Sequence, residues 1–209
     1  NEEGVVKLKD VSFTANSGEI LGIAGISGCG QKELLEAIAG LQPVESGTIA
    51  YMEPDGTKEM LIGKDPLKIA EMGVSLSFVP EDRLGMGLGN MDLADNMMLR
   101  SFRKGKTPFV NRKPARELAE HVVESLEVVT PGIHTPVRRL SGGNVQKVLL
   151  GREIASSPTV LLTAYAVRGL DINSSYTIYD LLNEQKKKGV AVVYIGEDLD
   201  VLLELSDRI

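Results

Sequence analysis

The feature that most constrains this chain is a glycine-rich turn between an apolar run and a helical pattern. The apolar run is Ile20 to Ala24, the turn is Gly25 to Gly30, and the helical pattern begins at Gln31. Glycines spaced in this way allow successive backbone N–H groups to converge on an anion, and the helix N-terminus behind them adds about half a positive charge. The stretch predicts a phosphate-binding loop formed by Gly25, Ser27, Gly28, Cys29, Gly30, Gln31 and Lys32.

The reactive end of this loop departs from the pattern that supports nucleotide chemistry. That pattern, G-x-x-x-x-G-K-[ST], requires a lysine where this chain has Gln31 and a hydroxyl where it has Lys32. A glutamine brings no charge to a phosphate, and a lysine repels the Mg²⁺ ion that a hydroxyl would bind. The sequence therefore predicts a phosphate-binding loop whose own affinity is weak and independent of metal.

Composition limits the other classes of function. A chain of 209 residues with 43% hydrophobic content can bury one core and an inserted lobe, and the net charge of −6 argues against a nucleic-acid surface. The single cysteine, Cys29, excludes an internal disulfide and a cysteine metal cage. We predict no metal site, no signal peptide and no membrane span. Because the chain begins at Asn1 and stops at Ile209 within a strand-like pattern, we interpret it as a fragment of a longer polypeptide.

Short apolar runs alternate with helical patterns along most of the chain. This alternation predicts an α/β fold with a mostly parallel sheet. Residues 82–139 instead show helical spacing with many methionines and basic residues, which predicts an inserted helical lobe. The expected strands are two within 5–23 and others at 48–52, 74–79, 160–163 and 190–195, and the expected helices lie at 33–39, 67–72, 144–155 and 174–187, with two more around 93–98 and 118–126.

A second glycine motif runs from Leu140 to Asn144. Its serine hydroxyl and two glycine N–H groups at a helix start are suited to a terminal phosphate. Taken alone, Ser141 is equally well explained as an ordinary helix N-cap. The order of the other motifs favours the phosphate interpretation: Val79-Pro80-Glu81-Asp82-Arg83 precedes it, and Arg168-Gly169-Leu170-Asp171 and Gly196-Glu197-Asp198-Leu199 follow it.

This series of motifs resembles the ATP-binding cassette (ABC) ATPases over essentially the whole chain. It is most similar to the carboxy-terminal half of the tandem ATPases that energise simple-sugar and nucleoside importers. The resemblance implies a P-loop NTPase core at 1–81 and 140–209 with a mostly parallel sheet, an antiparallel β subdomain, and an inserted α-helical subdomain at 82–139.

Matching the family's functional positions to this sequence shows that its own ATP site is degenerate. The phosphate-binding lysine and the metal-binding hydroxyl correspond to Gln31 and Lys32. The glutamine that senses the γ-phosphate corresponds to Glu81. The Asp-Glu pair, which supports Mg²⁺ and polarises the attacking water, corresponds to Ala164-Tyr165. The switch histidine corresponds to Glu197. Loss of one such group typically lowers the rate by about 10²–10³, so we expect no hydrolysis at this chain's own loop.

The resemblance also implies a role in trans. In this family the signature motif closes over ATP held by the opposite subunit, so Ser141, Gly142, Gly143, Asn144 and Asp171 are expected to contact the ATP of a competent partner half, where Mg²⁺ is also expected. Implied partners are a second ABC ATPase half in the same polypeptide, transmembrane permease subunits and, indirectly, a substrate-binding protein, with no nucleic acid. The implied location is cytoplasmic, peripheral at the inner face of the cell membrane. The alternatives are a regulatory ABC module that binds nucleotide without transport, and an ATPase with rewired chemistry.

Overall fold

The computed structural model describes residues 7–26, 28–53, 55–78, 88–99 and 111–209. The chain forms two compact units. The first unit combines residues 1–76, 158–164 and 185–209, and the second combines 77–157 and 165–184. The glycine loop therefore belongs to the first unit, whereas Ser141 and Asp171 belong to the second. The domain bounds expected from the sequence stay a prediction.

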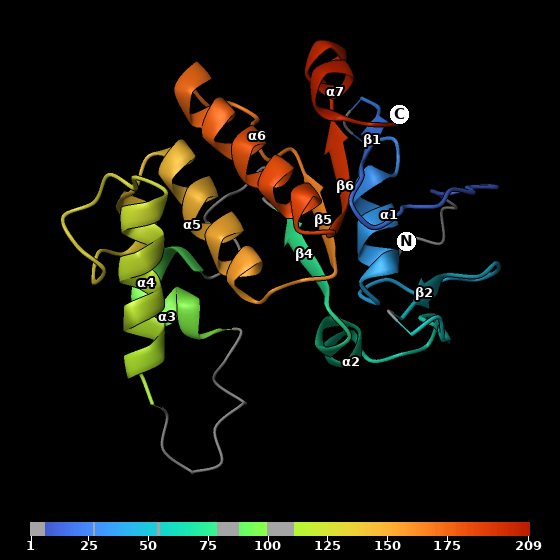
Figure 1. The fold of residues 1–209 in the computed structure, drawn as a ribbon, viewed down its shortest axis with the longest axis horizontal. Coiled ribbons are helices and arrows are strands. Elements are labelled where there is room, and N and C mark those ends of the chain that lie inside the picture. Colours follow the sequence, from blue (N-terminus) through green and yellow to red (C-terminus); the bar gives the residue numbers. More distant parts are fainter. Residues whose placement is uncertain (1–6, 27, 54, 79–87, 100–110) are drawn as a thin grey trace. The chain divides into compact units, whose positions relative to one another are not determined.

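A sheet with the strand order β1-β6-β5-β4 organises the first unit. Its strands are β1 (Ile20–Ala24), β4 (Val74–Phe78), β5 (Val160–Ala164) and β6 (Ala191–Gly196). Figure 1 shows β6 between β1 and β5, and it pairs with both in parallel. Every residue of β6 is buried, as expected of a parallel strand that is covered on both faces. The predicted α/β class with a mostly parallel sheet is confirmed.

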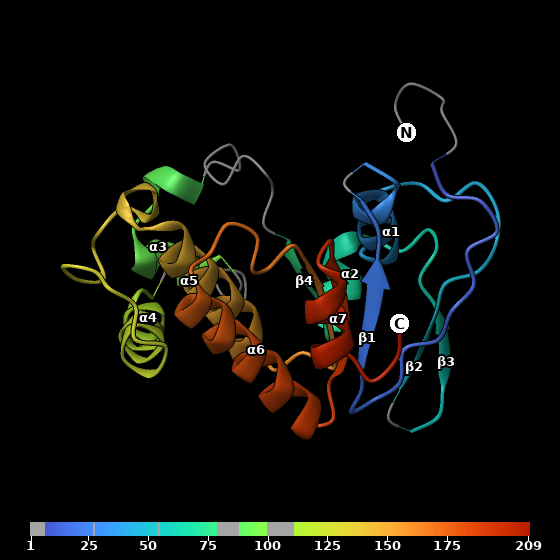
Figure 2. The same ribbon diagram turned by 90° about the horizontal axis from the view of Figure 1, so that it is seen from above.

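Two helices of the first unit pack on this sheet. Figure 2 shows β1 leading into α1 (Gln31–Ile38). Helix α1 packs against β5. The second helix, α7 (Leu199–Leu205), packs against β1 and β6. The sequence did not lead us to expect α7, although its N-cap is clear: the Asp198 carboxylate accepts the backbone N–H groups of Asp200 and Val201.

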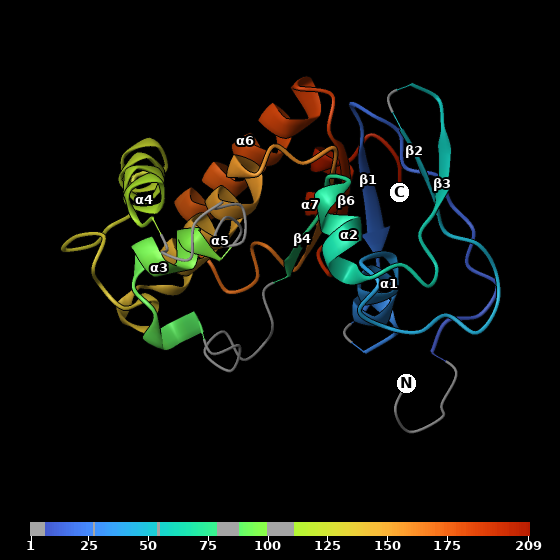
Figure 3. The same ribbon diagram turned by 90° about the horizontal axis from the view of Figure 1, so that it is seen from below.

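A small antiparallel hairpin completes the first unit. Strand β2 (Ala50–Met52) lies beside β3 (Lys58–Met60) in Figure 3. The two strands pair antiparallel, with Ala50 opposite Met60. The Tyr51 hydroxyl lies 2.7 Å from Thr159 Oγ1 and so links the hairpin to the start of β5. Helix α2 (Pro66–Glu71) follows, with Asp65 as its N-cap. The hairpin is the antiparallel part of the predicted fold class, although β3 was not expected.

One expectation for the amino-terminal region was wrong. The sequence predicted two strands before the glycine loop, but in the described residues 7–26 only β1 is a strand. Alternating apolar residues form a strand only where a neighbouring strand accepts their backbone hydrogen bonds and covers one face. The alternating side chains here remain largely uncovered, because Val11 is 48% exposed and Phe13 is 42% exposed.

The second unit is helical. Helix α5 lies between α4 and α6 in Figures 1 and 2. The helices are α3 (Leu93–Met98), α4 (Lys113–Ser125), α5 (Gly142–Ala155) and α6 (Ile172–Lys187), whose last residues join the first unit, with short 3-10 turns at η1 (Leu88–Asn90) and η2 (Val137–Arg139). Their core includes Leu93, Met97, Ala119, Val122 and Val148. Among the described residues, no helix combines the length and apolar character needed to span a membrane.

Candidate functional site

The glycine loop joins the carboxyl end of β1 to the first turn of α1. Gly28 and Gly30 adopt left-handed backbone conformations, with φ of 89° and 101°. The φ of Gly30 strains any residue with a side chain, and a Cβ atom there would lie 3.0 Å from the Lys7 carbonyl oxygen, so this position favours glycine. Gly30 is also the N-cap of α1 and provides no capping side chain. The structure thus contains the strand, loop and helix that the sequence predicted; Ser27 lies outside the described residues.

Gln31 takes the place expected for a phosphate-binding lysine, and its side chain folds back into the loop. It is 6% exposed, and its Nε2 donates to the Ile26 carbonyl oxygen over 2.8 Å. A Cβ atom on Gly25 would lie only 2.2 Å from this nitrogen, so the amide lies directly against Gly25. Gln31 Oε1 is buried without a hydrogen-bond partner among the described residues.

Lys32 extends along the helix. Its Nζ lies 3.7 Å from Glu36 Oε1, one helical turn further on, and its side chain is 56% exposed. The first turn of α1 also carries the acidic residue Glu33. Two carboxylates therefore accompany the one cation in this part of α1, which lowers the attraction of the helix start for an anion.

The other matched positions of the first unit lie at the carboxyl edge of the sheet. The β1 and β6 strands are in register with Ala24 opposite Gly196, so Gly25 and Glu197 follow at the same edge. Glu197 is exposed. Ala164 ends β5 and is fully buried, and it supplies no carboxylate. Among the residues that the structure describes, no group of three His, Cys, Asp or Glu side chains could hold a metal ion.

Tyr165 stands at the second position of the matched Asp-Glu pair and belongs to the second unit. Its φ of 54° is unusual for a residue with a bulky side chain. The guanidinium of Arg168 lies 5.8 Å from the centre of its ring, a distance that allows a cation–π interaction. Glu81, the matched sensor position, lies outside the described residues. The described matched positions all differ from the residue types expected from the resemblance; they are Gln31, Lys32, Ala164, Tyr165 and Glu197.

The start of α5 is ordered by side-chain hydrogen bonds. Ser141 is the N-cap, and its Oγ accepts from Asn144 Nδ2 over 2.9 Å. Asn144 Oδ1 in turn accepts the Val129 N–H over 3.1 Å. Ser141 is exposed and Gly142 is half-buried. The N-cap interpretation of Ser141 and the phosphate interpretation are therefore compatible, because the capping contact leaves the hydroxyl at the surface.

The structure brings Asp171 to the start of α5 through a residue that the sequence did not single out. Asp171 Oδ1 accepts the Ser174 N–H over 2.9 Å, and Ser174 Oγ donates to Asp171 Oδ2 over 2.7 Å. These hydrogen bonds hold the pKa of Asp171 below its ordinary value. A Cβ atom on Gly143 would lie 2.7 Å from Ser174 Oγ. These contacts form one cluster of Ser141, Gly143, Asp171 and Ser174. The sequence signal that could have identified Ser174 is the spacing Asp-x-x-Ser, which is typical of a helix N-terminus.

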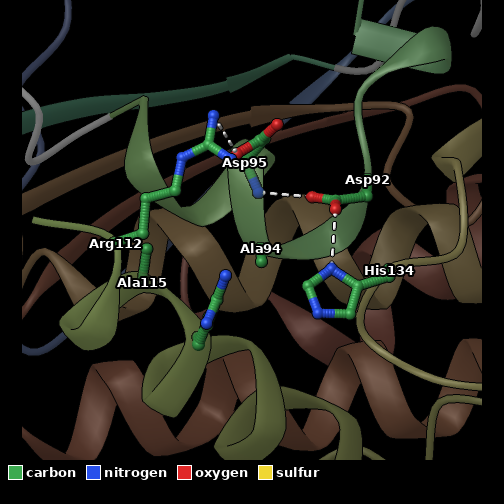
Figure 4. A pocket seen from close by; sticks show the side chains of 7 residues that line it. Asp92, Ala94, Asp95, Arg112, Ala115 and His134 are labelled. Carbon is green, nitrogen blue, oxygen red and sulfur yellow. Dashed lines mark hydrogen bonds and ion pairs between the residues drawn. The ribbon is translucent and has the colours of Figure 1, made fainter. Parts of the chain in front are cut away.

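A separate polar depression lies elsewhere on the second unit (Figure 4). Asp92 caps α3 by accepting the Asp95 N–H over 2.7 Å, and its other oxygen lies 3.0 Å from His134 Nδ1. Arg112 lies 3.6 Å from the Asp95 carboxylate. Because Asp92 is hydrogen-bonded to both α3 and His134, and Asp95 is paired with Arg112, the depression is best explained as a contact that holds the start of α3 in place.

Comparison with known proteins decides the family. The ABC transporter family model matches residues 8–163, which include the glycine loop and the start of α5. The chain belongs to the ABC transporter family. It is 37% identical to a glucose import ATP-binding protein of Haloferax volcanii, over 100% of this chain and 38% of that protein. It is 35% identical to a guanosine import ATP-binding protein of Bacillus subtilis, over 99% of this chain and 40% of that protein. This ABC chain therefore spans about two fifths of the length of these curated relatives.

Solved structures support the same fold. A nucleotide-free ATP-binding cassette from an ABC transporter matches 96% of this chain with a TM-score of 0.77 at 21% identity. A dimeric ATP-binding cassette in a post-hydrolysis state, bound to ADP and Pi, matches 93% with a TM-score of 0.75 at 23% identity. At these identities the similarity establishes the fold of this ABC chain and not its activity.

Proposed function

We propose that this chain is the non-hydrolytic, carboxy-terminal ATPase half of an importer for sugars or nucleosides. The names of the relatives, which are import ATP-binding proteins for glucose and guanosine, support the class of cargo. The full protein would contain a second, competent ATPase half and would act with transmembrane permease subunits and, through them, a substrate-binding protein. Its place would be the cytoplasmic side of the cell membrane, where closure of the two halves on ATP drives the permease.

The observation that carries this proposal is the contrast between two sites in the same chain. The first site has a capped helix start, an exposed serine hydroxyl and a carboxylate held by hydrogen bonds; its residues are Ser141, Gly143, Asp171 and Ser174. The chain's own loop holds an uncharged glutamine and two carboxylates near its helix start. The first arrangement favours contact with the phosphates of an ATP bound elsewhere, and the second disfavours catalysis in place.

The same contrast assigns the cofactor roles. The residues that would contact the ATP held by the partner half, where Mg²⁺ is also expected, are Ser141, Gly142, Gly143, Asn144 and Asp171. The glycine loop of this chain would bind nucleotide weakly. This binding would not depend on Mg²⁺, because Lys32 replaces the metal-binding hydroxyl. ATP hydrolysis would then depend on this chain without occurring at its loop.

The test is Ser141→Arg in the full-length protein with its permease. The long cation would occupy the space that the partner's phosphates need, so we expect the rate of phosphate release to fall by about 10² or more. Ser125→Arg is the matched control, because Ser125 is an exposed serine at the end of α4, and it should leave the rate unchanged. Turnover of Ser141→Arg at the wild-type rate would disprove the role in trans.

A further inference from the structure

The side chain of Gln31 occupies the inside of the glycine loop. It leaves the first residue of α1, returns toward Ile26 and donates to that residue's carbonyl oxygen over 2.8 Å. Its amide nitrogen lies so close to Gly25 that a Cβ atom there would be 2.2 Å away. With 6% of its surface exposed, the side chain is enclosed by the loop and is not an exposed chain lying over it.

This enclosed space is where the loop would hold an anion. Phosphates bind in front of a helix N-terminus that glycines leave open, because the first N–H groups point there and the helix dipole is positive. Gly30 caps α1 without any side-chain hydrogen bond, so no capping group takes that place. Gly28 leaves the outer side of the loop open, since a Cβ atom on it would meet nothing within 4 Å. The amide of Gln31 is the group that fills the inner side.

We propose that the Gln31 carboxamide is a built-in occupant of this anion cradle, which a phosphate enters only when the side chain leaves. This inference rests on the proposed function in one respect, namely that the loop is the idle member of the pair. Among the described residues, one hydrogen bond, to the Ile26 carbonyl oxygen, holds this amide in place, and its buried Oε1 has no partner there. An unpaired buried oxygen costs free energy. The amide is therefore displaceable, and we expect the loop to bind phosphate weakly.

The test is Gln31→Ala in the 209-residue chain, titrated with inorganic triphosphate by calorimetry. Removal of the occupant opens the cradle, and we expect binding to tighten by about threefold to tenfold, the net value of one such hydrogen bond. Gln42→Ala is the matched control. Gln42 follows the carboxyl end of α1, and its Nε2 lies 3.3 Å from Glu36 Oε2. This substitution should leave the affinity for triphosphate unchanged. If Gln31 instead donated to a bound phosphate, Gln31→Ala would weaken binding, and that result or no change would overturn the inference.

Two further measurements keep the test decisive if the alanine variant folds poorly. Gln31→Met retains the length of the side chain and fills the loop, so it should gain less affinity than Gln31→Ala. In the wild-type chain, the side-chain amide resonances of Gln31 should shift when triphosphate saturates the loop, and resonances that stay fixed while triphosphate binds would contradict displacement. These measurements report on the glycine loop of this chain alone. They therefore do not depend on the outcome of the Ser141→Arg experiment, which tests the proposed function.

Discussion

The Ser174 hydroxyl donates to the Asp171 carboxylate over 2.7 Å, and its oxygen lies where any side chain at position 143 would have to go. A Cβ atom on Gly143 would be 2.7 Å from Ser174 Oγ and 3.0 Å from Ser174 Cβ. Gly143 is thus needed for packing within the second unit, independently of the phosphate contact proposed for it.

We expect Gly143→Ala to destabilise the protein. Alanine is favoured over glycine in a helix by about 1 kcal/mol, but overpacking against Ser174 costs typically about 1–3 kcal/mol, so the net change should be a loss of about 1 kcal/mol, within a range of about 0–2 kcal/mol. Denaturant unfolding measures it. The double variant Gly143→Ala/Ser174→Gly removes the clash and should recover part of the loss. A Gly143→Ala variant that is about 1 kcal/mol more stable than the wild type would show that the helices separate without cost.

The carboxylate of Asp207 predicts a specific response to acid. It accepts the Ile20 N–H over 2.8 Å and pairs with Lys186, and these contacts hold its pKa below the ordinary value. A group whose pKa is depressed in the folded state stabilises the protein above its unfolded pKa, and this stabilisation is lost as the pH falls through the folded pKa. Stability should therefore decline below about pH 4, the ordinary range for aspartate.

Asp207→Asn tests this assignment. The variant should be less stable than the wild type at pH 7, and the difference should shrink as the pH is lowered from about 5 to 3. Thermal melts across this range give the comparison. Asp180→Asn, at an exposed position of α6, serves as the control and should follow the wild type. A gap that stays constant with pH would assign the effect to something other than the charge of Asp207.

Local sequence patterns were sufficient for most of the fold. The continuous apolar run of β6 and the glycine-flanked start of α1 are local signals, and both elements form where predicted. The segment that contains Val11 and Phe13 shows the limit, because its alternation predicts a strand only if a neighbouring strand is available. That condition depends on tertiary structure. The cap at Asp198, in contrast, was a local signal that the pattern of the following leucines should have reinforced.

The candidate sites divide in the same way. Residue types alone predicted that Gln31 and Lys32 lack the chemistry of the ATPase pattern. The direction of the Gln31 side chain could not be predicted, because it depends on a rotamer fixed by Ile26 and Gly25 in the folded loop. The contact between Asp171 and the start of α5 also required the structure, since Ser174 connects segments that are about 30 residues apart in the sequence.

The double variant Gln31→Lys/Lys32→Ser should restore metal-dependent nucleotide binding to the glycine loop of this chain. This pair restores the lysine and the hydroxyl of the ATPase pattern, removes the enclosed amide and eliminates the cation that repels metal. We expect ATP to bind at least about tenfold more tightly than to the wild type, since hydrogen bonds to charged groups contribute about 1.5–3 kcal/mol each. Binding should also become dependent on Mg²⁺, whereas wild-type binding should not change when the metal is removed.

Hydrolysis should nevertheless remain absent at the rebuilt loop. Ala164 and Tyr165 still supply no carboxylate to support Mg²⁺ or to polarise water, and phosphoryl transfer depends on such positioning and charge neutralisation. Titration of ATP with and without Mg²⁺, followed by a phosphate-release assay on the same 209-residue variant, measures both properties. Lys32→Ser alone is the control, because it introduces the hydroxyl while Gln31 still fills the loop. Metal-dependent binding by the wild-type chain, or phosphate release by the rebuilt one, would refute the assignment of roles to these positions.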